Sequence, residues 1–328
     1  MTSRTRRLIV GAFGALAVTV VSQLSASAQD YPTRPVQMIV GYAPGGAGDV
    51  VARLIAEKLT ERLGQQVIVD NRPGASGAIA ARMVVRAEPD GQTLLVGQTA
   101  EIAVNQFIIP NLGYDAATEL QSIALAGIIP LGLVVQAASP YPTIEALLDA
   151  AKSSPDGLTF ASAGNGTPGH LAGELLRART GGNLTHVPYK GGGPALTDVL
   201  GGHVDFFFSG LPGAMPHVAA GNLKVLAVST AKRSSSSPDV PTVAESGIAD
   251  FDIGLWVGFF APKGTPQQIV GLLNKNINEI LASPDMQRRL QEQGLEIASM
   301  SVAETAAFVA AEIAKYGEII KVTGVKGD

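Results

Sequence analysis

The amino-acid sequence predicts an α/β protein in which two similar domains face each other across a hinged cleft. Three observations lead to this class. Short apolar runs alternate with helix-like patterns along most of the chain. Two units of strand, glycine-rich loop and helix occur, at 36–63 and 158–179, so the pattern restarts near residue 130. The 328 residues are 46% hydrophobic and 16% charged, which is enough apolar surface to fill two cores.

The order of the elements follows from these patterns. Apolar runs predict strands at 36–40, 67–70, 93–97, 158–162, 185–187, 204–208 and 225–229. Helical patterns, two of them opened by the cap residues Thr143 and Ser301, occur at 49–63, 76–86, 144–152, 168–179, 195–201, 266–281 and 302–322. Further apolar runs lie at 122–129, 132–136 and 253–260. This alternation favours mainly parallel sheets flanked by helices, which bind ligands beyond the carboxyl ends of their strands.

The final helices must pack against one of the two domains. If they return to the first domain, the chain crosses between the domains twice, near 128–132 and 248–254. We therefore expect one domain from 29–129 plus 251–328 and another from 130–250, joined by two crossover strands. Two domains joined in this way form a hinge that closes on a small molecule.

The first 28 residues have the composition of a signal peptide. Arg4, Arg6 and Arg7 form a basic start, residues 8–21 are apolar, and Ala26-Ser27-Ala28 fits the rule for cleavage after Ala28. The apolar run is shorter than the ~20 residues that a membrane span needs. General and twin-arginine export remain alternatives. Because the chain has no cysteine, we expect a free, soluble exported protein without disulfides or a lipid anchor.

The balance of charges limits the classes of partner. The leader holds three of the 24 Lys and Arg residues and no acid, so the mature chain carries 21 bases against 28 acids, a net charge of −7. An acidic protein is a poor partner for nucleic acid or for an anionic membrane surface. An anionic ligand must therefore be bound by local geometry, against the overall field.

The loop Ala43-Pro44-Gly45-Gly46-Ala47-Gly48-Asp49 joins the first strand to the first helix. A glycine-rich turn ahead of a helix presents backbone N–H groups to an anion. No Gly-Lys-Ser/Thr follows it, so the loop is not a triphosphate-binding P-loop. Asp49 stands where a helix N-cap belongs, and we predict a capping role for it.

The second loop, Gly164-Asn165-Gly166-Thr167-Pro168-Gly169, has the spacing of a dinucleotide-binding fingerprint. That interpretation needs an acid at the end of the next strand, which instead ends in Tyr189-Lys190, and Pro168 removes a backbone donor inside the motif. Binding of an anion at the helix start survives both objections. Thr167 and Pro168 also fit an ordinary N-cap, and His170 is either a backbone-bonded side chain or a ligand contact.

Motifs for catalysis and metal binding are not found. The sequence has no G-x-S-x-G or H-E-x-x-H, and its four histidines lie in separate segments, so we predict no catalytic residue, no metal and no cofactor. Glu101, after the third strand, is either a solvated loop acid or a partner for an amino group on a ligand. Tyr189 and Ser209 stand at strand ends, where a side chain can face a cleft.

Seven collinear motifs resemble the tripartite tricarboxylate transporter receptor family, also called the Bug family. Each motif is modest alone, but together they span the whole mature chain. They are Tyr31-Pro32-x-Arg34-Pro35, Pro44-Gly45-Gly46-Ala47-Gly48-Asp49, Asp70-Asn71-Arg72-Pro73-Gly74-Ala75-Ser76-Gly77, Asn165-Gly166-Thr167-Pro168-Gly169-His170-Leu171, Val187-Pro188-Tyr189-Lys190-Gly191, Gly202-His203-Val204-Asp205 and Pro238-Asp239-Val240-Pro241-Thr242-Val243-x-Glu245-x-Gly247.

The resemblance implies a type II periplasmic-binding-protein fold of the Venus-flytrap kind. It also implies a monomeric periplasmic receptor that captures a small carboxylate and delivers it to the large and small membrane subunits of a transporter. Backbone amides and water would meet the carboxylate oxygens. One wall of the cleft would contain Tyr42, Ala43, Pro44, Gly46, Gly48, Asp49, Gln98, Thr99 and Glu101. The other would contain Ser162, Gly164, Asn165, Thr167, His170, Tyr189 and Ser209.

The sequence departs from the family pattern at two places in the predicted pocket. Ile102 stands where many members have histidine, and Ala47-Gly48 stands where Gly-Thr or Gly-Ser is usual. Glu101, so near the pocket, favours a ligand that also bears an amine. The alternatives to transport are a sensor subunit that reports the same ligand to a signalling partner and an exported enzyme, for which the sequence offers no nucleophile–base pair.

Overall fold

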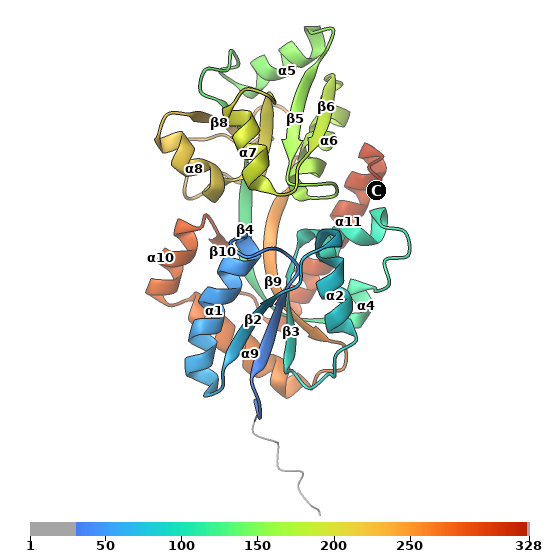
Figure 1. The fold of residues 1–328 in the computed structure, drawn as a ribbon, viewed down its shortest axis with the longest axis vertical. Helices are drawn as coiled ribbons and strands as arrows, with labels where there is room; N and C mark the ends of the chain where they lie inside the picture. The colour runs from blue at the N-terminus through green and yellow to red at the C-terminus, as the bar shows by residue number, and fades with distance from the viewer. Residues whose placement is uncertain (1–30, 327–328) are drawn as a thin grey trace, which may run out of the picture.

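The computed structural model describes residues 31–326, and the predicted leader with its cleavage site lies outside them. Figure 1 shows an elongated molecule in which two groups of strands and helices lie one above the other. β4 and the segment that leads into β9 connect the two groups. No helix in this part of the chain is long and apolar enough to cross a membrane.

The lower group in Figure 1, which we call the first half, is built on the strand order β2-β1-β3-β9-β4. β1 (Val36–Val40) pairs in parallel with β2 (Val67–Asn71) and β3 (Thr93–Gln98). β9 (Gly254–Pro262) runs antiparallel to β3 and β4, and β10 (Glu296–Ile297) adds to β4. Its helices and short turns are α1 (Ala47–Leu63), η1 (Ala75–Gly77), α2 (Ala78–Val85), η2 (Ala100–Val104), α3 (Asn105–Ile108), α4 (Ala116–Glu119), α9 (Gln267–Leu281), α10 (Pro284–Glu292) and α11 (Val302–Thr323).

The upper group, which we call the second half, continues the strand order from β4 through β7 and β5 to β6. β5 (Leu158–Ser162) pairs in parallel with β6 (Leu184–Pro188) and β7 (Phe206–Gly210). β8 (Leu223–Val228) runs antiparallel to β4. The helices of this half are α5 (Ile144–Ser153), α6 (Pro168–Thr180), α7 (Gly192–Leu200) and α8 (Leu211–Ala219).

The strand β4 (Leu120–Gln136) belongs to both halves. The apolar runs at 122–129 and 132–136 form this one strand, which pairs with β9 through Pro130 and with β7 from Leu131 onward. The second crossing lies beside it, because Ser229 donates its N–H to Leu131 O (2.8 Å) and Ile253 donates to Ser229 O (2.9 Å). The two segments that pass between the halves are therefore hydrogen-bonded neighbours.

The sheets are mixed rather than mainly parallel, which corrects the expectation from sequence. Four strand pairs are parallel and five are antiparallel. The parallel pairs lie within the strand–loop–helix units, as predicted. Every antiparallel pair involves β4 or β9, because β4 leaves the first half and β9 returns to it, so these two strands run in opposite directions.

The starts of α1, α2 and α7 differ from the prediction by two or three residues, and α7 begins at Gly192 rather than at residue 195. α1 begins at Ala47 with Gly46 as its N-cap, so Asp49 lies in the first turn and is not the cap residue. The helix expected from residue 76 begins two residues later, because Ala75 and Ser76 adopt positive φ (47° and 48°) in the turn ahead of it. A left-handed conformation at two non-glycine residues is unusual and often marks a functional loop.

Besides the four-residue α3 and α4, two longer helices, α8 and α10, are not predicted by the sequence patterns. α8 carries Pro212 and Gly213 near its start and Pro216 in its interior, and both residue types are unfavourable in helices. α10 buries only Met286 and Leu290, so its apolar pattern is sparse. Neither helix contains a predicted site residue.

The central strands of the first half are covered on both faces. Val36, Met38 and Val40 are fully buried in a cluster with α1 and α9, while Ile39 packs with α2 in the cluster on the other face. Strands buried on both sides are typical of parallel sheets between helices. The loops at their carboxyl ends therefore start from a fixed frame.

Candidate functional site

The loops that follow β1, β2 and β3 lie at one edge of the first sheet, because parallel strands point their carboxyl ends the same way. Asn71 Nδ2 at the end of β2 donates to Tyr42 O (3.0 Å) after β1. Tyr42 Oη in turn donates to Glu101 Oε2 (2.7 Å) after β3. These two bonds tie together the three loops that contain the first set of predicted site residues.

Asp49 holds the first glycine loop in shape. Its buried carboxylate accepts hydrogen bonds from Gly45 N (2.9 Å), Arg53 Nε (3.0 Å) and Asn71 Nδ2 (2.9 Å). Burial alone raises the pKa of Asp49, but the hydrogen bonds from Arg53, Gly45 and Asn71 outweigh it, so the pKa lies below its usual value. The ionised carboxylate therefore fixes the conformation of the loop from its buried side.

Gly48 lets a side chain lie directly on this loop. A Cβ added at Gly48 would stand 2.6 Å from Nε2 of the buried Gln98. The family pattern noted above has Thr or Ser at this position. In this chain the amide of Gln98 occupies the space that such a side chain would need, so the wall of the site is built from a different polar group.

Glu101 braces the loops from inside. It is 1% exposed, and its Oε1 accepts from Gln98 N (2.8 Å) while its Oε2 accepts from Tyr42 Oη (2.7 Å). Burial raises the pKa of this carboxyl to about 8, so the group is mainly neutral at pH 7. Both oxygens have protein partners, and the expectation of an amine-bearing ligand therefore has no structural basis here.

Thr99 connects the site to the crossing segment. Its fully buried hydroxyl donates to Gly254 O (3.2 Å) and accepts from Trp256 N (3.0 Å), both at the beginning of β9. These two bonds use the hydroxyl to connect the end of β3 to β9. Its contribution to a site is to fix the loop relative to the second crossing.

The second glycine loop is held by neutral groups. Ser162 Oγ accepts from Gly164 N (3.1 Å) and lies 2.7 Å from His186 Nε2. Thr167 Oγ1 donates to Gly164 O (2.7 Å). Thr167 is the N-cap of α6 with Pro168 at the first helical position, as predicted, although its hydroxyl bonds the loop rather than a helix amide.

His170 closes this loop from the helix side. Its Nδ1 accepts a hydrogen bond from Gly166 N (3.0 Å), and its ring stacks on His186 with centroids 3.9 Å apart. This is the backbone-bonded arrangement, one of the two interpretations of His170 from sequence. Because an accepting nitrogen carries no proton, the bond from Gly166 requires Nδ1 to be unprotonated.

Tyr189 directly follows β6 and Ser209 lies on β7, the two strands that pair with β5 ahead of the second loop. Tyr189 N donates to Ser162 O (3.0 Å), and its hydroxyl donates to Asp198 Oδ2 (2.6 Å) on α7. Partial burial and the Asp198 carboxylate raise the pKa of Tyr189 to about 12. Ser209 is buried, and its hydroxyl donates to Gly210 O (3.2 Å). Both hydroxyls thus have partners within the second half.

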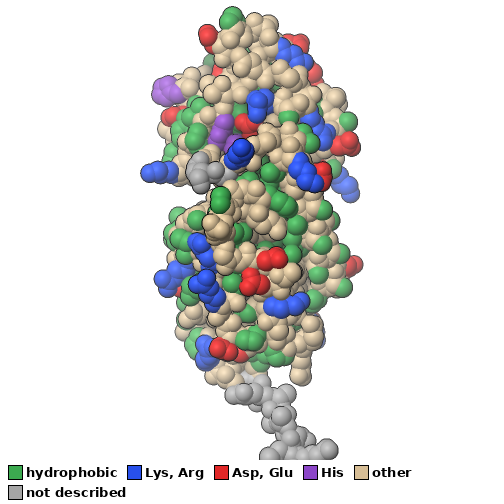
Figure 2. Space-filling model, turned by 90° about the vertical axis from the view of Figure 1, so that its right-hand side faces the viewer, with side chains coloured by type: hydrophobic (Ala, Val, Ile, Leu, Met, Phe, Trp, Pro, Cys, Tyr) green, Lys and Arg blue, Asp and Glu red, His purple; other side chains and the backbone are tan. Residues whose placement is uncertain are grey.

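The second loop meets the first half at residues that sequence reasoning did not single out. Ser76 Oγ donates to Asn165 O (3.5 Å), and a Cβ on Gly166 would lie 2.3 Å from Ile108 Cδ1. The space-filling view shows the molecule narrowing between its halves at mid-height (Figure 2). The motif around Ser76 was visible in the sequence, but nothing local indicated that it would touch a loop 89 residues away.

The groups that could bind a ligand in this arrangement are the backbone amides at the starts of two helices. In α1 and α6 the first helical hydrogen bonds run from Val50 to Gly46 and from Leu171 to Thr167, so the amides before Val50 and Leu171 have no acceptor inside the helix. Such amides and the positive ends of the two helices favour an anion. Among residues 31–326, no group of three or more His, Cys, Asp or Glu side chains is placed to hold a metal.

Comparisons with known proteins agree with this picture. Residues 51–325 match the model of the tripartite tricarboxylate transporter family receptor. Protein BugT of Bordetella pertussis is 36% identical over 301 residues, which is 92% of each chain. A protein of Pseudomonas sp. strain P51, described by its place in the tcbD-tcbE intergenic region, is 38% identical over 89% of this chain and 87% of its own.

Solved structures show the same fold. An R. palustris protein with adipate superposes with a TM-score of 0.84 at 36% identity, covering 91% of this chain and all of its own. The periplasmic binding protein BugD gives 0.81 at 35% identity, covering 91% and 100%. MatC of Rhodopseudomonas palustris with bound malate gives 0.80 at 32% identity, covering 88% and 100%. The chain therefore belongs to the TctC, or Bug, family of tripartite tricarboxylate transporter receptors, which are periplasmic solute-binding proteins and not enzymes.

Proposed function

We propose that the protein captures a small dicarboxylate between its two halves and delivers it to the large and small membrane subunits of a tripartite transporter. The observation that supports this proposal is the pair of glycine loops, each ahead of a helix start, one in each half. The turn after β2, which is bonded to the first glycine loop through Asn71, contacts the second loop where Ser76 meets Asn165. Two anion-favouring ends suit a ligand with two carboxylates. The adipate and malate bound by two relatives are of this class.

The sixteen site residues predicted from sequence divide into two roles. Gly46, Gly48, Gly164 and Asn165 offer backbone close to the ligand, together with Ala43, Pro44, Gln98 and Thr167. The others position these loops through the bonds described above: Tyr42, Asp49, Thr99, Glu101, Ser162, His170, Tyr189 and Ser209. Backbone binding explains how a chain of net charge −7 can hold an anion, because no excess of bases is needed.

Capture requires the halves to move. We propose that 29–129 plus 251–328 and 130–250 act as two domains that close by bending at β4 near Pro130 and at the segment between Ser229 and Ile253. At these crossings two neighbouring segments, hydrogen-bonded to each other at Leu131, Ser229 and Ile253, connect the halves, and a pair of connecting segments suits a hinge. Ligand would shift the receptor from the open to the closed form, and the membrane subunits would bind the closed form preferentially. The monomer would be exported to the periplasm with cleavage after Ala28.

A thermal-shift screen of residues 29–328 tests the proposal. The panel contains adipate, malate, citrate, benzoate, glutamate, adipamide and NAD. A ligand at 100 times its dissociation constant adds about 2.7 kcal/mol of stability, which raises the melting temperature by several degrees. We expect shifts with dicarboxylates and none with adipamide or NAD. Shifts with adipamide as large as with adipate, or with none of the acids, would refute anion capture.

A further inference from the structure

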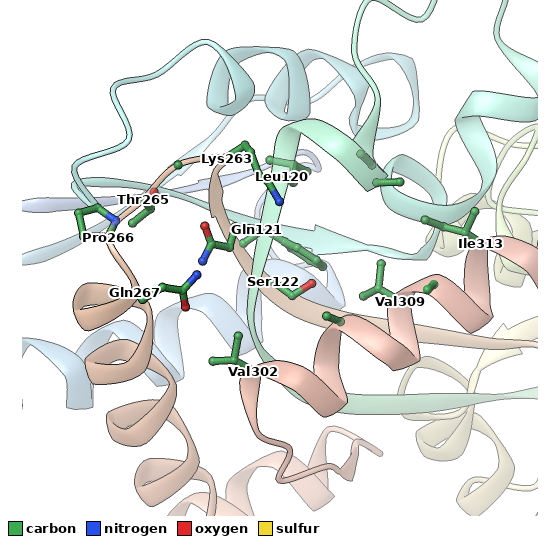
Figure 3. Close-up of a pocket in the computed structure, with 16 residues that line it drawn as sticks. Leu120, Gln121, Ser122, Lys263, Thr265, Pro266, Gln267, Val302, Val309 and Ile313 are labelled. Atoms are coloured by element: carbon green, nitrogen blue, oxygen red, sulfur yellow. The ribbon is translucent and has the colours of Figure 1, made fainter.

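A cavity lies in the first half, away from the glycine loops. Its volume is about 620 Å³, and it is open to solvent and bordered by α4, the beginning of β4, the turn after β9, and helices α9 and α11 (Figure 3). The strand β4 begins at this cavity and reaches the crossing at Pro130 ten residues later. The cavity therefore lies at the far end of the crossing strand from the carboxylate site.

The walls of this cavity separate into an apolar side and a polar end. Val302, Val309 and Ile313 of α11 line one side, with Leu120 and Phe260. Figure 3 shows Lys263, Gln121 and Gln267 directed into the opposite end. A volume of this size suits a small organic ligand. The division predicts a ligand with an apolar body and one polar group.

The polar end offers one buried donor without a protein partner among residues 31–326 and one exposed cation. Gln121 Nε2 is buried and has no hydrogen-bond partner. Lys263 has no ion pair with any residue in the described part of the chain. Gln267 opens the 15-residue helix α9, whose positive end favours an anion. No carboxylate lines the cavity. The buried Gln121 Nε2 is costly to leave without an acceptor, whereas the exposed Lys263 is free to meet an anion that enters from solvent.

From this geometry we propose that the α9–α11 cavity is a second binding site, for an organic acid with a single carboxylate and an apolar chain. The carboxylate accepts from Gln121 Nε2 and Lys263 Nζ at the polar end. The chain lies along Val302, Val309 and Ile313 of α11. The site differs from the one between the halves in taking an apolar body and only one charge.

Calorimetric titration of residues 29–328 with butyrate, hexanoate and octanoate tests this site. We expect octanoate to bind and the affinity to rise about fourfold for each methylene that enters the cavity. Ala310 lines the cavity and is exposed on α11, so Ala310→Phe fills the space without disturbing the core and should abolish octanoate binding. Ala314→Phe, one turn further on an exposed position outside the cavity, is the matched control and should bind as the unaltered chain does.

The polar end has its own test. Lys263→Gln should lower the affinity for octanoate at least tenfold. Lys275→Gln, which removes the same charge from an exposed position on α9, should change this affinity less than twofold. Ala306→Phe, also lining the cavity, replaces Ala310→Phe if that variant does not fold. Absence of octanoate binding, or binding that Ala310→Phe leaves intact, would overturn the proposal. Adipate binding is measured on the same variants, and its persistence separates this site from the one between the halves.

Discussion

The two glycine loops occupy corresponding places in the two halves, yet they are supported by different chemistry. The first is held by a charged network, in which the buried carboxylate of Asp49 receives Arg53, Asn71 and a loop amide. The second is held by hydroxyl groups and an unprotonated imidazole, through Ser162 and His170. Similar loop geometry therefore does not require similar side chains, provided that a buried acceptor holds at least one amide of each loop.

The charged network predicts how the first loop responds to acid. Because the pKa of Asp49 is lowered in the folded protein, its contribution to stability is complete above the unfolded value of about 3.9 and is lost as the pH falls below it. The first loop should therefore keep its order down to about pH 4.

Removal of Asp49 should have the largest effect. Asp49→Ala leaves Asn71 and the Gly45 amide without their buried acceptor, and we expect a loss of about 2–4 kcal/mol in the free energy of unfolding, with at least tenfold weaker ligand binding. Asp70→Ala removes an acid from the neighbouring β2 that pairs only with the half-exposed Arg72. Equal urea midpoints for the two variants would show that the charged network does not hold the loop.

Removal of the imidazole should have an intermediate effect. His170→Phe preserves a ring against His186 but leaves Gly166 N without its acceptor, which we expect to cost about 1–2 kcal/mol and several-fold in ligand affinity. His203→Phe alters a side chain that is 73% exposed and serves as the control. If the affinity of His170→Phe matched that of the control, the second loop would not depend on this bond.

Glu101 gives a prediction in which the sign depends on pH. Its pKa of about 8 in the folded protein exceeds its unfolded value, so the folded state binds the extra proton and stability falls as the pH rises from about 4.5 to 8. Glu101→Gln removes this slope. Urea unfolding at pH 5 and pH 8 gives the free energy of unfolding of both proteins. Relative to the unaltered chain, the variant should be more stable at pH 8 than at pH 5. The same difference in free energy at both pH values would contradict a buried, neutral Glu101.

The smallest effect on stability is expected at Gly48. Gly48→Ala meets only the far end of the Gln98 side chain, which can turn aside, so the free energy of unfolding should change by less than about 1 kcal/mol. Ligand affinity should fall, because the displaced amide enters the site. Gly271→Ala on α9 has open space around it and should leave affinity unchanged. Similar affinities for the two variants would mean that Gln98 does not line the site.

The sequence predicted local structure well because local patterns determine it. The strand Leu158–Ser162 and the loop before α6 follow from apolar runs and a proline at the first helical position. The roles of Asp49 and Glu101 did not follow, because the partners of Asp49 include Asn71, which is 22 residues away, and Glu101 is buried by Tyr42, which is 59 residues away. A sequence alone does not show that a loop acid will be enclosed by two other loops.

The same limit applies to the contact between the halves. The approach of Ser76 to Asn165 depends on how the two halves meet across β4, and on a left-handed turn at two non-glycine residues that no propensity favours. The mixed sheet has a similar origin, since the direction of β9 is set by the return of the chain to the first half.

The most direct test of the central claim is a crystal structure of residues 29–328 with the dicarboxylate that gives the largest thermal shift. The account predicts one carboxylate within hydrogen-bond distance of amides at 46–48 and the other within reach of amides at 164–170, with the two halves closed around the ligand. A ligand held mainly by side chains, or bound with no contact to one of the two loops, would contradict it.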